Sequence, residues 1–225
     1  MRLVLLAAEP GEAKALARQL GLEQVREESW LSRYGLFERH EVTLVEAGVG
    51  KVAAASACAW AITRWQPQAL VWAGLAGSLR EDLKPLEVLV AHEALQWDVD
   101  LSAFGRAPGE LPDGSRWIAT DPELSQLLLK AAQSLGISAH LGRVLSGDRF
   151  IQGPEREALR RFGGDVAEME GAAALWVARR FGVPFALVRV ISDGIQEGPK
   201  AFQERFAAAS EELSELLAHF LRMLR

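Results

Sequence analysis

The run Phe185–Ile191 is short, apolar and rich in β-branched residues, and clear breaks bound it on both sides. Gly182-Val183-Pro184 comes directly before it, and Ser192-Asp193-Gly194 comes directly after it. A run of this length is too short for a helix and predicts a strand buried on both faces, as in a parallel sheet. Such strands carry polar residues to their carboxyl ends, where open α/β sheets place their ligand sites. The run therefore predicts an α/β fold with a site just beyond Ile191.

An acidic cluster, Glu168-Met169-Glu170, precedes this strand and is followed by an Ala-rich run that ends at Phe181. The pattern predicts a strand, a turn and a helix, with the acids close to the turn. We expect Glu170 and Asp193 to lie together at one rim of the sheet. Arg189 lies inside the apolar strand, and a buried guanidinium is costly unless it meets a carboxylate or a ligand. These charges favour a functional site over a purely structural turn.

The rest of the chain alternates between short apolar strands and amphipathic helices, which is typical of one α/β domain with a largely parallel central sheet. No repeat, linker or low-complexity tract interrupts residues 1–225. We also expect a polar hairpin around Tyr34-Gly35 and a packing turn at Gly74–Ser78, whose glycines match a phosphate-binding loop only weakly. The other expected strands are 3–8, 42–45, 70–73, 88–95 and 141–145, and the other expected helices are 10–20, 51–65, 122–134, 155–162 and 199–225.

Charge and cysteine content narrow the classes of partner and compartment. The formal net charge is −5 and no basic stripe is visible, which argues against a nucleic-acid partner. No apolar run reaches the ~20 residues of a membrane span, and the apolar start at Leu3–Ala8 is too short for a signal peptide. The single Cys58 cannot form an internal disulfide, so a reduced, cytoplasmic compartment is the simplest expectation. The histidines are scattered without ligand spacing, so we expect no metal site, and we expect no cofactor.

Carboxylates at the ends of strands remain as the candidates for chemistry. They are Glu12, Glu168, Glu170 and Asp193, with Arg189 among them. Pairs of carboxylates serve bond-breaking at an anomeric carbon, where one activates water and the other protonates the leaving group. Each such proton transfer typically contributes ~10²–10⁴-fold in rate. For Glu12 a plain alternative stays open, because the helix dipole stabilises any acid in the first turn of a helix.

Six short motifs follow one another along the chain: AGVGKVAAA (47–55), GLAGSL (74–79), WDVDLSAFG (97–105), SGDRFI (146–151), EMEGAA (168–173) and VRVISD (188–193). Together they resemble the 5′-methylthioadenosine/S-adenosylhomocysteine nucleosidases of the purine nucleoside phosphorylase superfamily, and the last three are specific in combination. The resemblance covers nearly the whole chain. It implies a single-domain, three-layer α/β/α sandwich with a mixed, largely parallel central sheet. It also implies a homodimer that cleaves the N-ribosidic bond of a purine nucleoside and releases adenine.

The resemblance further implies a role for each residue of the site. Glu12 would activate the attacking water, and Asp193 would give a proton or a hydrogen bond to N7 of the departing purine. Glu170 would hold the ribose hydroxyls, with Met169 and Arg189 beside it. Burial at the end of a strand would favour the protonated carboxyl that Asp193 needs for this role. The remaining implied contacts are Phe150, Ile151 and Ser192 for the purine, and Val49, Phe202 and, from a second subunit, Phe104 and Pro112 for the 5′ substituent.

Water is the expected nucleophile, because Glu9 and Glu12 in the loop after the first strand would repel a phosphate dianion. Four residues depart from the pattern of the family: Glu9, Leu75, Trp97 and Arg106. The first two bear on the positioning of water. The last two bear on the choice of substrate, since Arg106 could pair with a carboxylated 5′ group. Three alternatives stay open: a futalosine-type nucleoside hydrolase, a purine nucleoside phosphorylase, and a nucleoside-binding protein without turnover.

Overall fold

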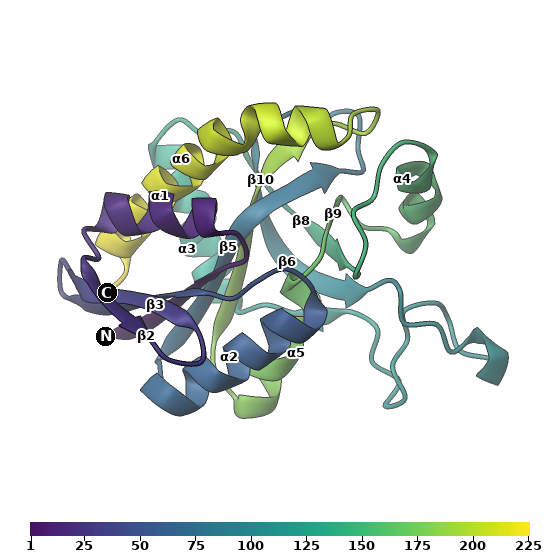
Figure 1. Ribbon diagram of the computed structural model, residues 1–225. Helices are drawn as coiled ribbons and strands as arrows, with labels where there is room; N and C mark the ends of the chain where they lie inside the picture. Colours follow the sequence, from purple (N-terminus) through teal and green to yellow (C-terminus); the bar gives the residue numbers. More distant parts are fainter.

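A mixed β-sheet runs through the middle of the computed structural model, which describes residues 1–225 (Figure 1). Its central strands are parallel: β1 pairs with β4 on one side and with β5 on the other, and β5 pairs in turn with β10. The register sets Leu5 of β1 between Leu44 and Val71, so apolar side chains line up across neighbouring strands. The strands are β1 (Arg2–Ala7), β2 (Gln24–Glu27), β3 (Leu31–Phe37), β4 (His40–Glu46), β5 (Ala69–Ser78), β6 (Val88–Gln96), β7 (Ile118–Ala119), β8 (Ala139–Ser146), β9 (Val166–Glu168) and β10 (Phe185–Asp193).

The far half of the sheet closes on itself. Strand β10 also pairs with β6, and the pairing continues through β8 and β9 back to β5. The strands β5, β10, β6, β8 and β9 therefore form a ring. The closure brings strand ends together, because Ser146 of β8 pairs with Glu168 of β9 and Asp193 of β10 pairs with Gly77 of β5.

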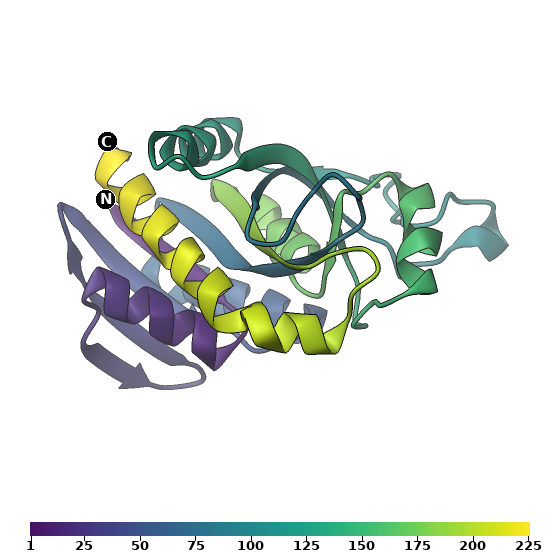
Figure 2. The ribbon, with the colours of Figure 1, turned by 90° about the horizontal axis from the view of Figure 1, so that it is seen from above.

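Helices cover the two faces of the sheet (Figure 1). One face carries α1, α3 and α6, whose side chains share one apolar core with β1, β5 and β10, and Figure 2 shows α6 lying along α1. The other face carries α2 and α5, which pack on each other and share a second apolar core with the same strands. The helices are α1 (Pro10–Leu20), α2 (Lys51–Trp65), α3 (Pro122–Ser134), α4 (Pro154–Leu159), α5 (Gly171–Phe181) and α6 (Pro199–Met223).

These layers confirm the three-layer α/β/α sandwich and its mixed sheet. Helices α2 and α3 begin and end at the residues that the sequence predicts. The start of α3 has a local cause: the side chain of Asp121 accepts hydrogen bonds of 3.0 and 2.9 Å from the backbone N–H groups of Glu123 and Leu124. Such a cap satisfies donors that a helix start leaves free.

The expected hairpin around Tyr34-Gly35 is wrong. Both residues lie inside β3, and the chain turns instead at Glu38-Arg39, where Glu38 has a φ of +52°. Gly35 makes room for a neighbour, since a Cβ there would lie 3.3 Å from a methyl carbon of Leu22. A glycine needed for space resembles a glycine needed for a turn when only the sequence is read.

The expected turn at Gly74–Ser78 is also wrong, because β5 continues through it to Ser78. Its glycines make room for charged side chains. A Cβ at Gly74 would lie 3.1 Å from both Glu12 Oε1 and Arg189 Nη1, and a Cβ at Gly77 would lie 2.6 Å from Arg156 Nη2. The glycines of β5 thus mark the place where buried charges gather.

The two termini lie together at one end of the molecule, and α4 lies at the other end (Figure 1). Beside α4 an arm, residues 97–117, extends away from the sheet and contains only a short 3-10 turn, Ser102–Phe104. No helix combines the length and the apolar character needed to cross a bilayer.

Candidate active site

A cavity of about 210 Å³ lies at the carboxyl ends of β9 and β10, beside the first turn of α1. Its wall also takes residues from the loop before α2, the end of β5, the segment after β8 and the start of α6. Ten residues predicted from the sequence line it: Glu12, Val49, Phe150, Ile151, Glu168, Met169, Glu170, Ser192, Asp193 and Phe202. Three predicted residues, Arg189, Phe104 and Pro112, lie outside the wall.

Glu12 is a buried acid and not a surface residue of the first helical turn. It is 4 % exposed, and its two oxygens face different partners. Oε2 accepts a hydrogen bond of 3.0 Å from the backbone N–H of Glu9, at the start of α1, and Oε1 accepts one of 3.1 Å from the backbone N–H of Leu75 on β5. Burial raises the pKa of Glu12 to about 7, against the opposing effect of these hydrogen bonds. A carboxyl with that pKa can take up a proton near neutral pH.

Glu170 stands at the start of α5, and its Oε1 accepts a hydrogen bond of 2.9 Å from the backbone N–H of Gly50. This bond ties the β9–α5 turn to the glycine loop before α2. Burial, and then the charge of nearby Glu168, raise the pKa of Glu170 to about 8. The side chain faces the cavity with one oxygen left for a ligand, which suits a pair of ribose hydroxyls.

Arg189 lies near Glu170 but does not line the cavity. Its guanidinium is 1 % exposed and forms an ion pair with Glu168, which itself lines the cavity. Glu168 also accepts hydrogen bonds from Ser146 and from the backbone N–H groups of Glu170 and Gly171. The pair therefore holds the turn that carries Glu170, and the positive charge of Arg189 opposes the rise in the pKa of Glu12 and of Glu170.

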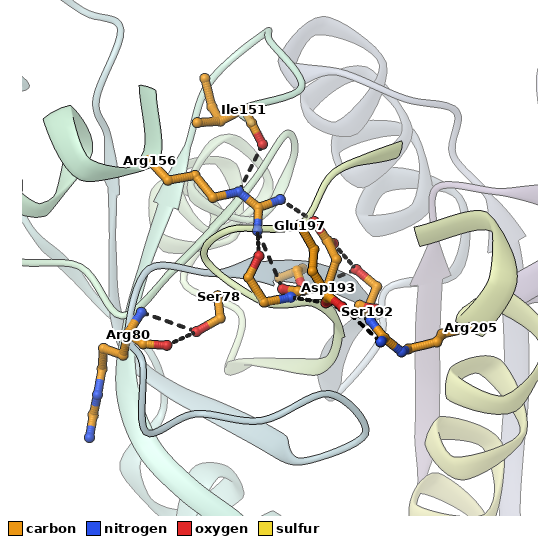
Figure 3. A network of polar contacts seen from close by, with 10 residues as sticks. Ser78, Arg80, Ile151, Arg156, Ser192, Asp193, Glu197 and Arg205 are labelled. Atoms are coloured by element: carbon orange, nitrogen blue, oxygen red, sulfur yellow. Dashed lines mark hydrogen bonds and ion pairs between the residues drawn. The ribbon is translucent and has the colours of Figure 1, made fainter. Parts of the chain in front are cut away.

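Asp193 ends β10 and is 1 % exposed. The hydroxyl of Ser192 donates a hydrogen bond of 2.6 Å to its Oδ1, and Arg156 forms an ion pair with its Oδ2 (Figure 3). Sequence reasoning missed Arg156 altogether. Nothing in the spacing of the 155–162 segment separates it from Arg160 and Arg161, which lie exposed on the same segment.

Aromatic rings form the wall of the cavity next to α6. Phe150 meets Phe202 edge to face, with ring centres 5.8 Å apart, and Phe202 meets Phe206 in the same way at 5.6 Å. Phe150 is 40 % exposed, so one part of its ring is free for contact with a flat ligand. An aromatic face of this kind favours stacking with a base.

The arm carries Phe104 and Pro112 away from the cavity of their own chain. Phe104 is 82 % exposed, and Pro112 lines a separate hollow of about 660 Å³ between the arm and the helices α2 and α5. This hollow is larger than the acid-lined cavity, but no buried acid reaches it. The chemistry therefore belongs to the smaller cavity.

Arg106, for which a pairing with a carboxylated 5′ group was expected, makes hydrogen bonds within the arm. Its Nη1 donates hydrogen bonds of 2.8 Å to Glu110 and 3.3 Å to the carbonyl of Leu111. Its Nη2 donates one of 2.9 Å to the carbonyl of Pro112. Arg106 thus fixes the shape of the arm.

Comparison with known proteins agrees with this geometry. The family model described as the phosphorylase superfamily matches residues 2–222. The chain belongs to the phosphorylase superfamily.

Among similar proteins, a 5′-methylthioadenosine/S-adenosylhomocysteine nucleosidase of Actinobacillus succinogenes is 35 % identical, with 81 % of each chain covered. An aminodeoxyfutalosine nucleosidase of Helicobacter pylori is 33 % identical, covering 84 % of this chain and 82 % of the relative. A crystal structure of the H. pylori methylthioadenosine/S-adenosylhomocysteine nucleosidase, in complex with a pyrrolidine-based ligand, superposes with a TM-score of 0.96 at 29 % identity, covering 100 % of this chain and 99 % of that one. These matches confirm the resemblance inferred from the motifs. The chain is an N-glycosyl hydrolase of the nucleosidase type.

The two buried acids predict how stability depends on pH. Folding raises the pKa of Glu12 and of Glu170 from 4.5 to about 7 and about 8, so the folded state holds these protons more tightly than the unfolded chain. Their contribution to the free energy of unfolding is therefore largest below pH 4.5 and is lost as the pH rises through 7 and 8.

Urea unfolding of the wild type and of a Glu170→Gln variant, at pH 5 to 8, measures this contribution. We expect the variant to gain stability relative to the wild type as the pH rises, because glutamine has no proton to lose. All other titrating groups are common to both proteins and cancel. A stability difference that stays constant over this interval would contradict the raised pKa of Glu170.

Proposed function

We propose that the chain hydrolyses the N-ribosidic bond of 5′-methylthioadenosine and S-adenosylhomocysteine and releases adenine, as a step in methionine salvage. One observation carries the proposal: Glu12, Glu170 and Asp193 come from three distant parts of the chain and line one cavity. All three are buried, so their charges act in a medium that screens them weakly. Acids gathered in one small cavity suit a reaction that builds positive charge on a sugar.

The residues divide the reaction between them. As the C1′–N9 bond breaks, its electron pair goes to the purine, and N7 is protonated by Asp193, which has to take up a proton before this step. The oxygen of water bonds to C1′, and Glu12 takes the proton that this water loses. Glu170 binds the ribose hydroxyls, and in its ionised form it stabilises the cationic sugar. Phe150 stacks on the base, and the backbone of Ile151 meets its Watson–Crick edge.

Water is favoured over phosphate as the nucleophile by the way the arginines are used. A phosphate dianion needs cationic donors that are free to bind it. The two buried arginines at or behind the wall, Arg156 and Arg189, already pair with Asp193 and Glu168. Arg149 at the mouth pairs with Glu155. A phosphate dianion at the end of the cavity next to Glu12 would therefore meet an acidic side chain and no unpaired cation.

The choice of 5′ substituent has a second candidate, because a relative that is 33 % identical is named an aminodeoxyfutalosine nucleosidase. The engaged guanidinium of Arg106 favours an uncharged thioether at this position over a carboxylated group. Val49 and Phe202 at the cavity wall supply apolar surface for such a thioether.

A product assay tests the proposal. The protein is incubated in phosphate-free buffer with methylthioadenosine, S-adenosylhomocysteine and aminodeoxyfutalosine in separate reactions, and the bases and sugars released are quantified. Adenine together with free methylthioribose supports the proposal. Faster release from aminodeoxyfutalosine supports the second candidate, and a strict need for added phosphate supports a phosphorylase. Nucleoside binding without release of any base would identify a protein that only binds.

We also infer that the working unit is a cytoplasmic homodimer in which the arm of one subunit completes the 5′ pocket of the other. Phe104 is the most exposed large apolar side chain of the molecule, at 82 %, and Val49 and Val52 are exposed beside the cavity and the hollow. Apolar surface gathered in this way is typical of a protein interface.

Replacing Phe104 by Ser should lower kcat/KM for methylthioadenosine by about 10- to 100-fold. The expected loss corresponds to the ~1.5–3 kcal/mol gained when a phenylalanine side chain is buried. Leu36→Ser is the matched control, because Leu36 is 70 % exposed on β3, away from the cavity. Sedimentation velocity of both variants checks the assembly. Equal activity of the two variants would remove Phe104 from the pocket.

A further inference from the structure

Arg156 is a buried arginine next to the cavity, and all three of its guanidinium nitrogens donate hydrogen bonds. It projects from α4, is 1 % exposed and lines the cavity wall. Its Nε donates a hydrogen bond of 3.0 Å to the carbonyl of Ile151, and its Nη1 donates to the carbonyls of Asp193 and Gly194. Its Nη2 forms the ion pair with Asp193 Oδ2 (Figure 3). One guanidinium thus joins the segment that reads the base to the acid at the end of β10.

The strands beneath leave space for this guanidinium. A Cβ at Gly77 on β5 would lie 2.6 Å from Arg156 Nη2 and 2.9 Å from its Cζ, so only a glycine lets the plane of the guanidinium approach β5 this closely. The other carboxylate oxygen of Asp193 accepts the hydrogen bond from Ser192 at 2.6 Å. Both oxygens of the acid are therefore held, and its orientation is fixed.

A second arginine supports the same strand end from the opposite side. Arg205 on α6 pairs with Glu197 at 2.6 Å, and Glu197 accepts a hydrogen bond of 2.7 Å from the backbone N–H of Gly194 (Figure 3). Residues 192–194 therefore lie between the contacts of Arg156 and those of the Arg205–Glu197 pair. Arg156 differs from Arg205 in being almost wholly buried and in touching the acid itself.

Burying an ion pair is expensive, and apolar side chains of similar volume often give equal or better stability. The polar partners of Arg156 are confined to Ile151, Asp193 and Gly194, all next to the place proposed for the base. A buried charge whose contacts all serve one subsite is better explained by the function of that subsite than by folding.

We propose that Arg156 is a positioning residue for the purine half of the reaction. It fixes the carboxyl of Asp193 relative to the Ile151 segment. Asp193 can then contact N7 of a 6-aminopurine while the backbone of Ile151 contacts the Watson–Crick edge of the same base. The inference rests on the proposed function and adds to it a residue that acts through Asp193.

The test compares Arg156→Met, Arg156→Lys and the matched control Arg160→Met, whose arginine is exposed and pairs only with Glu157 of its own segment. Each change is also made in an Asp193→Asn background. We expect Arg156→Met to lower kcat for methylthioadenosine by about 10²-fold, with a smaller change in KM, and Arg156→Lys to restore part of the loss. In the Asp193→Asn background, Arg156→Met should lower kcat by less than about threefold, because residues acting as one unit are not additive.

Titration calorimetry with free adenine supplies a second readout that does not need turnover. Adenine should bind Arg156→Met at least about tenfold more weakly than the wild type or Arg160→Met, since one misplaced polar contact is worth about 1.4 kcal/mol or more. The wild type could cleave no nucleoside while Arg156→Met still bound adenine more weakly than the wild type. That result would refute the proposed function and would support the role of Arg156 in positioning the purine site. If Arg156→Met does not fold, Arg156→Lys carries the comparison. Equal losses of kcat in both backgrounds, or unchanged adenine binding, would overturn the inference.

Discussion

Replacing Asp193 by Asn should lower the rate of adenine release from methylthioadenosine by at least ~10²-fold, the usual contribution of a positioned acid. Asparagine keeps the shape of the side chain and can still accept the hydrogen bond from Ser192, but it has no acidic proton for N7. The departing purine then has to leave as an anion. Single-turnover release of adenine, followed by the change in ultraviolet absorbance, measures the loss directly.

The same substitution should also weaken the fold, because it removes the charge that Arg156 meets. Breaking a buried ion pair from one side typically costs ~3–5 kcal/mol, and the amide oxygen that remains should reduce this figure. Asp121→Asn is the matched control: Asp121 caps α3, and Asn caps a helix about as well as Asp. Asp121→Asn should retain both activity and stability. Near-normal turnover of Asp193→Asn would remove Asp193 from the role of acid.

Much of the fold follows from local patterns in the sequence. Helix α2 spans an uninterrupted Ala-rich run, and α3 starts with Asp-Pro, which pairs a capping side chain with a residue suited to the first turn. The strand β10 was visible as an apolar run between two breaks. These features depend on residues close in the chain, and such signals survive without any knowledge of what packs against them.

The errors in the predicted structure arose where the role of a residue depends on a neighbour that is distant in the sequence. Gly35 and Gly77 were both expected in turns, and the contacts with Leu22 and Arg156 show that each glycine makes room for a neighbour. Arg189 was expected near Glu170, and the structure adds the ion pair that it forms with Glu168. Glu168 and Glu170 are only two residues apart in the chain. The sequence spacing therefore cannot show which of the two forms the ion pair with Arg189.

The candidate site needed more than spacing. Glu12 begins α1 and Asp193 ends β10, and the structure brings them to one cavity because β1 and β10 both pair with β5 in parallel, so that their carboxyl ends reach the same edge. That order of strands is a property of the whole sheet. The motifs supplied it through resemblance to known nucleosidases. Arg156 lay in none of the roles that the resemblance assigned, and the contacts in the structure were needed to find it.

Replacing Glu12 by Gln should abolish hydrolysis, with a loss of ~10²–10⁴-fold or more, while nucleoside binding stays within a few-fold of the wild type. The amide can still accept the hydrogen bond from Leu75, so the cavity keeps its shape, but it cannot take a proton from water. The pH dependence of the wild-type enzyme tests the same role, because the pKa of Glu12 is about 7. A base has to be ionised to act, so log kcat/KM should fall as the pH drops below about 7, with a slope that approaches one per pH unit.

The control for Glu12→Gln is Glu9→Gln, since Glu9 shares the loop and the cavity wall but leaves the proton-accepting role to its neighbour. Glu9→Gln should keep most of the activity, with an acidic limb moved slightly to lower pH because the charge of Glu9 helps to raise the pKa of Glu12. Glu12→Gln should bind methylthioadenosine in calorimetry without releasing adenine. Retained hydrolysis in Glu12→Gln would mean that the carboxylate serves only to tie the start of α1 to β5. Glu12 would then serve only to accept the two hydrogen bonds from Glu9 and Leu75, and another residue of the cavity would have to act as the base that deprotonates water.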